Sequence, residues 1–110
     1  MLFTSQVTHM SKNEIVSEKI RAIIHRRKGR DIYDLWYLLT QHSSLDTNLI
    51  SEKFKYYGET YQPNALIKRI QDFPKNVFIN DLKPFVQLNE RDKLSELFTY
   101  VIAFLESALV

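Results

Sequence analysis

Residues 94–109 carry an apolar side chain at every third or fourth position. The repeat consists of Leu94, Leu97, Phe98, Val101, Ile102, Leu105 and Leu109. Because an α-helix turns once every 3.6 residues or so, this spacing places all of these side chains on one helical face. We therefore predict a long C-terminal helix, capped at Asn89, whose apolar face packs on the domain or on a partner.

The remainder of the chain is predicted to be helical as well. Only two glycines and three prolines occur in 110 residues, which disfavours a turn-rich β-sandwich. We predict one all-α domain over residues 1–110, a bundle of five or six helices. Its parts would be an extended segment over 1–13 with one strand near Phe3–Val7, a helical hairpin over 14–41, and the remaining helices over 45–110.

The hairpin is predicted from the signals at its ends. Residues 11–14, Ser-Lys-Asn-Glu, have the spacing of a capping box that opens a helix. This helix should run to about Lys28 and end at Gly29, since glycine is common just after a helix. A second helix would begin at Arg30 or Asp31, and so short a link makes the two helices antiparallel neighbours.

Several classes of protein are disfavoured by composition. The chain has no cysteine, which excludes disulfides and thiolate metal sites. Its first residues lack the features of a signal peptide, and no apolar run approaches the roughly 18 residues that cross a bilayer. The three histidines lack the spacing of a helical metal pair, so no metal site is predicted. We expect a cytoplasmic protein without membrane contact.

Positive charge is concentrated in residues 21–30. The net charge is only +2, yet this segment contains five of the fifteen basic residues and no acid. One explanation is structural, because the helix dipole favours cations at the end of one helix and anions at the start of the next by ~0.3–1 kcal/mol each. The other is a surface that contacts phosphate or RNA.

Lys19 and two aspartates favour the second explanation. Lys19 lies close to the apolar stripe of its helix, where a lysine either extends to solvent or points into a pocket. Asp31 and Asp34 stand one turn apart on one helical face. Such a pair accepts a proton, binds a metal, or forms a salt bridge with Arg30.

The segment EKIRAIIHRRKGRDIYDLWYLL, residues 18–39, resembles a known sequence pattern. It is similar to the part that follows the catalytic core in AbiEii/AbiGii-type nucleotidyltransferase toxins of type IV toxin–antitoxin and abortive-infection systems. In that family a Glu-Lys-(Leu/Ile)-Arg-Ala helix leads to a basic turn and then to Arg-Asp-hydrophobic-aromatic-Asp-Leu. The resemblance covers residues 14–39 well and the remaining helices loosely. It implies the C-terminal helical half of such a toxin.

The resemblance also implies roles for individual residues. Lys19 would contact the nucleotide triphosphate together with Arg30, and Asp31 would be the catalytic aspartate of the last active-site motif. The supporting residues would be Glu18, Arg21 and Asp34. For phosphoryl transfer this division is reasonable, because a cation neutralises phosphate charge while a carboxylate organises the site.

The chain departs from the family pattern before Glu14. Family members carry a Gly-Ser turn and an Asp-x-Asp metal pair there, whereas this chain has neither, and Asp-x-Asp occurs nowhere in it. We expect a truncated, internally initiated or degenerate start. The isolated chain would then be inactive, and Mg²⁺ and NTP would bind only with a complete catalytic core. The partners implied are that missing core, an antitoxin and, by family analogy, tRNA.

Helix geometry limits how Lys19 and Asp31 cooperate. Ten residues of helix from Lys19 to Gly29 correspond to ~15 Å. We therefore expect Lys19 and Asp31 to open onto one solvent-filled cleft and to touch opposite ends of a nucleotide, but not each other.

A second hypothesis is a non-catalytic module. It would bind another protein, or RNA through residues 21–30 with Arg26, Arg27 and Lys28 as the contacts, or form homo-oligomers through its C-terminal helix. Trp36 and Tyr37 could stack a base, although Trp36 also fits the buried stripe.

Overall fold

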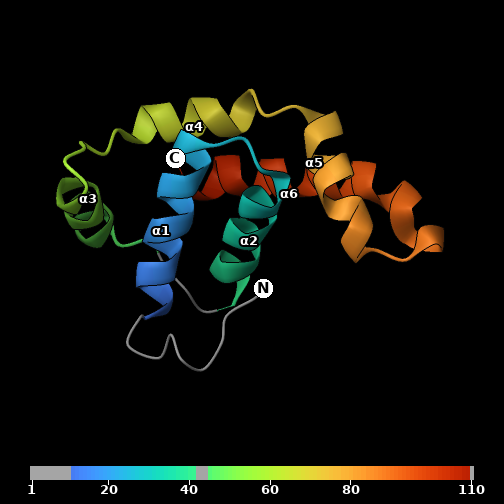
Figure 1. Ribbon diagram of the computed structural model, residues 1–110, viewed down its shortest axis with the longest axis horizontal. Helices are drawn as coiled ribbons and strands as arrows, with labels where there is room; N and C mark the ends of the chain where they lie inside the picture. The colour runs from blue at the N-terminus through green and yellow to red at the C-terminus, as the bar shows by residue number, and fades with distance from the viewer. Residues whose placement is uncertain (1–10, 42–44, 110) are drawn as a thin grey trace.

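The structure, a computed structural model, describes residues 11–41 and 45–109, and within these ranges it consists of α-helices and short 3₁₀ turns without a strand (Figure 1). The helices are α1 (Lys12–His25), α2 (Gly29–Thr40), α3 (Thr47–Tyr56), α4 (Pro63–Gln71), α5 (Lys75–Leu82) and α6 (Leu94–Ala108). Two 3₁₀ segments, η2 (Lys83–Phe85) and η3 (Leu88–Lys93), connect α5 to α6. The predicted all-α class is confirmed, and the expected strand near Phe3–Val7 lies outside the described residues.

The α1–α2 hairpin lies at the centre of the bundle. The two helices run antiparallel and side by side (Figure 1). α1 also packs against α3 and α4, whereas α2 packs against α5 and α6. α4 crosses the end of α1 and reaches α6, so the hairpin is enclosed between the two halves of the bundle. Both helices of the hairpin are therefore packed against other helices of the bundle.

The core is built from the apolar faces that the sequence periodicity predicts. The residues buried in these faces include Val16, Ile20, Ile23, Ile32, Leu35, Leu38, Ile50, Phe54, Leu66, Ile70, Phe78, Leu94, Val101 and Leu105. Burying one such side chain stabilises the fold by about 1.5–3 kcal/mol. On α6, Val101 and Leu105 are fully buried, while Tyr100 on the other face is 60% exposed. None of the helices described is both long and apolar enough to cross a membrane.

Local capping also follows the sequence. The Ser11 hydroxyl accepts a hydrogen bond from the Glu14 N–H at 3.1 Å, as half of the predicted capping box. The Asp46 carboxylate accepts one from the Leu49 N–H at 3.1 Å and so begins α3. Gly58 follows α3 with a φ of 74°, a conformation that L side chains rarely adopt.

The hairpin turn differs from the prediction. α1 already begins at Lys12 and ends at His25, before the predicted Lys28, because Arg26 and Lys28 are extended with φ of −144° and −115°. Gly29 does not follow the end of α1 but is the first residue of α2. Its lack of a side chain serves packing instead, since a Cβ there would lie 2.7 Å from the Cα of Phe78 in α5.

The last helix also begins at another residue than predicted. Asn89 lies within η3 and does not cap α6, which starts at Leu94. Leu94 is only 2% exposed, so α6 begins where the apolar stripe first reaches the core.

Candidate functional site

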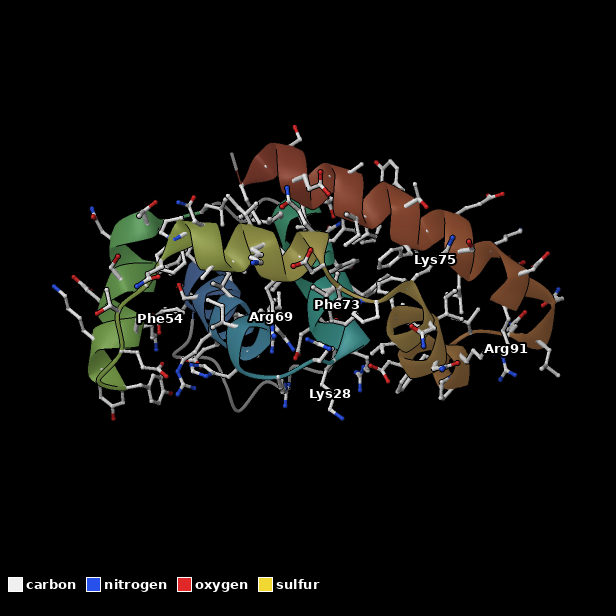
Figure 2. The ribbon with its side chains drawn as sticks, turned by 90° about the horizontal axis from the view of Figure 1, so that it is seen from above. Lys28, Phe54, Arg69, Phe73, Lys75 and Arg91 are labelled. Carbon is white, nitrogen blue, oxygen red and sulfur yellow. The ribbon has the colours of Figure 1, made fainter. Side chains whose placement is uncertain are left out.

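A cleft of about 480 Å³ opens where the α1–α2 turn meets α5. The described residues that line it are Lys19, Arg26, Lys28, Arg30, Asp31, Asp34 and Asp81. All of them are ionisable, four as cations and three as carboxylates. Lys28 extends outward from the turn between α1 and α2 (Figure 2). The cleft is therefore a polar site, and it contains three of the five basic residues of segment 21–30, namely Arg26, Lys28 and Arg30.

Asp31 is the most buried charge of the cleft. It lies in the first turn of α2 and is 2% exposed. Arg26 binds it with two hydrogen bonds, Nε to Oδ2 at 2.7 Å and Nη2 to Oδ1 at 3.0 Å. This bidentate pairing raises the pKa of Arg26, chiefly through the hydrogen bond and then through the charge of Asp31. Both carboxylate oxygens of Asp31 are thus engaged within the protein.

Lys19 joins the two aspartates of α2. Its Nζ lies 2.9 Å from Asp34 Oδ2 and 3.5 Å from Asp31 Oδ1, so the prediction that Lys19 and Asp31 do not touch is wrong. Because α1 ends at His25, Lys19 lies only about 9 Å along the helix axis from the end of α1. The long lysine side chain spans the rest of the distance to Asp31. The Lys19 side chain is 20% exposed and that of Asp34 8%.

Asp81 is a member of the cleft that the sequence did not reveal. Its Oδ2 accepts a hydrogen bond from the Gly29 N–H at 2.7 Å, across 52 residues of sequence. α2 needs this partner, because its N-cap residue Lys28 makes no side-chain capping bond. Nothing local marks Asp81 in the sequence, since its role depends on α5 packing against the start of α2.

Two cations of the cleft are not neutralised by internal carboxylates. Arg30 does not form the salt bridge with Asp31 that the sequence suggested; its guanidinium instead lies over the ring of Phe85, 4.3 Å from the centroid. Within the described part of the chain, neither Lys28 nor Arg30 forms an ion pair. These two side chains, together with the carboxylate of Asp81, determine the net charge that the cleft presents to a ligand.

Other residues singled out in the sequence lie elsewhere. Glu18 is 3.6 Å from Lys53 Nζ and links α1 to α3, whereas Arg21 Nε is 2.9 Å from Glu59 Oε1 and links α1 to the loop that follows α3. Arg27 lines a second cavity of about 330 Å³, between α1 and α4. The first cleft thus receives Arg26 and Lys28 from the basic turn but not Arg27.

The aromatic pair considered for base stacking is also outside the cleft. Trp36 lies between Tyr33, at a centroid distance of 5.4 Å, and Tyr100, at 6.0 Å. Tyr37 stacks on Tyr33 at 6.5 Å. Neither Trp36 nor Tyr37 lines the cleft.

The paired aspartates contact cations of the protein. In the ranges that the structure describes, no group of three or more His, Cys, Asp or Glu residues could hold a metal ion. Mg²⁺ needs carboxylate oxygens with access to water and phosphate. Both oxygens of Asp31 bind Arg26, and Oδ2 of Asp34 lies 2.9 Å from Lys19 Nζ.

Comparison with protein families identifies the chain. Comparisons with curated proteins and with solved structures give no match. A family model described as nucleotidyl transferase AbiEii toxin, type IV TA system, matches residues 2–103, nearly the whole chain. This span includes every residue of the cleft and extends well beyond the motif at 14–39. The chain therefore belongs to the AbiEii nucleotidyl transferase toxin family of type IV toxin–antitoxin systems.

Proposed function

We propose that this chain is the helical part of an AbiEii-type nucleotidyltransferase that binds the triphosphate of an NTP in the cleft between α1, α2 and α5. One observation carries the proposal. Lys19 and Asp31, to which the family resemblance assigns site roles, line the same cleft as two cations without internal ion pairs.

The charge of the cleft suits a multiply charged anion. Asp31 and Asp34 balance Arg26 and Lys19, and Asp81 offsets one of the two remaining cations, Lys28 and Arg30, so the four cations and three carboxylates leave the cleft with one net positive charge. Cations gathered in a cleft focus the field and raise the local concentration of an anionic ligand. Arg30 offers the planar fork that binds phosphate oxygens in pairs, and Lys28 adds a flexible point charge.

Lys19 is able to bind a phosphate while it holds the aspartates. An ammonium group has three donors, and the two carboxylates at 2.9 and 3.5 Å use two of them. The 20% exposure of the side chain gives a ligand access to the third. Neutralising phosphate charge in this way is the main task of protein cations in phosphoryl transfer.

Asp31 acts as a positioning residue in this proposal. It is too buried to reach a substrate and fixes the guanidinium of Arg26 and the ammonium of Lys19. Without it, both cations would lose the geometry that faces the cleft. The carboxylates that hold Mg²⁺ would come from a catalytic core carrying the acidic pair that this sequence lacks.

We further propose that the chain alone transfers no nucleotide. The family implies an antitoxin as its counterpart, and RNA, with tRNA as the family analogy, is the proposed acceptor. Incubation of the purified chain with radiolabelled NTP, Mg²⁺ and total RNA tests this. We expect no label in RNA, and incorporation above that of heat-denatured protein would refute the proposal.

The resemblance implies that NTP binds only with a complete catalytic core, but every described residue of the cleft belongs to this chain, so we propose that NTP binding, unlike transfer, occurs without that core. Calorimetric titration of the purified chain tests this. We expect Lys28→Ala and Arg30→Ala each to weaken NTP binding roughly tenfold, because each removes a charged contact to phosphate. Lys55→Ala and Lys75→Ala are matched controls, since both are exposed lysines outside the cleft. Added salt should weaken wild-type binding. Absence of saturable binding, or equal losses in the controls, would exclude the cleft as the binding site.

A further inference from the structure

Phe85 is exposed although it is a large apolar side chain. Among the phenylalanines that the structure describes, Phe54, Phe73 and Phe78 are buried and Phe98 and Phe104 are half-buried. Phe85, in η2, is 61% exposed. It follows shortly after Asp81, which lines the cleft from the end of α5.

Arg30 connects this ring to the cleft. Its guanidinium lies 4.3 Å from the centroid of the Phe85 ring and also forms part of the cleft wall. A cation over an aromatic face is attracted by the negative charge of that face. The Phe85 ring therefore lies in stacking contact with Arg30, which a ligand in the cleft would also contact.

We propose that Phe85 and Arg30 together bind an NTP at the edge of the cleft, with the nucleobase on the face of the Phe85 ring that Arg30 leaves uncovered and phosphate oxygens on the edge of the Arg30 guanidinium. The inference rests on the proposed function and assigns the part of the site that lies beyond the triphosphate. Nucleobases stack on aromatic rings and on guanidinium planes, and such stacking covers apolar surface that Phe85 now exposes. Trp36 and Tyr37, which line no part of the cleft, would not contribute.

Base recognition by this pair should be permissive. Stacking uses the π-face that every base has, so it discriminates between bases less than hydrogen bonding to their edges does. We therefore expect ATP and GTP to bind with similar affinity, because both purines offer the same stacking area.

The test separates the base from the phosphates by comparing ATP with inorganic tripolyphosphate. We expect Phe85→Ala to weaken ATP binding roughly tenfold and tripolyphosphate binding much less. Equal losses for the two ligands would mean that Phe85 acts only by positioning Arg30, and would contradict base stacking. Phe85→Trp should restore ATP binding, since it restores an aromatic face. Tyr100→Ala is the control, because Tyr100 is 60% exposed on α6, which contributes no residue to the cleft. Circular dichroism of each variant verifies folding.

A fluorescent analogue gives a second, independent reading. The triphosphate of 2-aminopurine riboside loses fluorescence when its base stacks, so binding to the wild-type chain should quench it and binding to Phe85→Ala should not. If tripolyphosphate binds the wild type but Phe85→Ala does not change ATP affinity or quenching, the base-stacking inference is wrong and the phosphate cleft stands. If tripolyphosphate does not bind the wild type, both proposals fail.

Discussion

Replacement of Lys19 by methionine should destabilise the fold, because it leaves a buried carboxylate without its cation. Methionine keeps most of the unbranched apolar stem and removes only the ammonium. Asp34, with its side chain 8% exposed, then loses its ion pair at 2.9 Å, whereas Asp31 keeps both hydrogen bonds from Arg26. The cost of the substitution is therefore dominated by Asp34.

The size of the effect follows from the geometry. At an effective dielectric constant of about 20, two unit charges 2.9 Å apart attract by about 6 kcal/mol, and the desolvation of both groups offsets part of this. Breaking a buried ion pair by removing one partner costs about 3–5 kcal/mol. Because Lys19 is 20% exposed, we expect the lower end, a loss of about 3 kcal/mol in the free energy of unfolding.

Urea denaturation at neutral pH measures this loss. Lys53→Met is a matched control: Lys53 also lies near two carboxylates, Glu14 and Glu18, each 3.6 Å away, but these are 32% and 30% exposed. That variant should lose no more than about 1 kcal/mol. In a double-mutant cycle, Lys19→Met and Asp34→Asn should couple by about 2 kcal/mol. Additive effects, or equal losses from Lys19→Met and Lys53→Met, would refute the reasoning.

Two further predictions concern the packing of the bundle. Gly29→Ala should destabilise the fold by about 1–3 kcal/mol, because the new Cβ would lie 2.7 Å from the Cα of Phe78 and force α2 and α5 apart; an unchanged urea midpoint would contradict this. Burial raises the pKa of Tyr61 above its ordinary 10.0, so the folded protein keeps the phenol neutral while the unfolded chain ionises, and stability falls as the pH rises above 10. Tyr61→Phe should reduce that alkaline loss in denaturation curves below and above pH 10, and an identical loss in both proteins would refute the assignment.

The ion cluster of the cleft serves both the fold and the proposed site. Asp31 and Asp34 are buried charges, which are tolerated only when paired. The pairs hold Lys19 and Arg26 at the cleft, where the proposed ligand would add its own negative charge. This double role explains why binding is tested with Lys28 and Arg30, whose substitution breaks no internal ion pair.

Local features of the fold were predictable from the sequence. The cap at Ser11 depends on side chains and backbone within a few residues. The buried faces follow from the 3.6-residue period, as the burial of Val101 and Leu105 on α6 shows. The family resemblance was likewise predictable from the sequence, because the order and spacing of the charged residues of its motif lie within residues 14–39.

The amino-acid sequence by itself determined the helical class, the buried faces and the family, because each is encoded over a few turns of chain. The tertiary structure decided where α1 ends, what Gly29 is for and which charges meet. A side chain at position 29 would clash with the backbone of Phe78, and the N–H of Gly29 donates a hydrogen bond to Asp81, 52 residues away. Lys19 reaches Asp31 because α1 stops at His25. These contacts depend on how separate helices pack, and no local pattern specifies that.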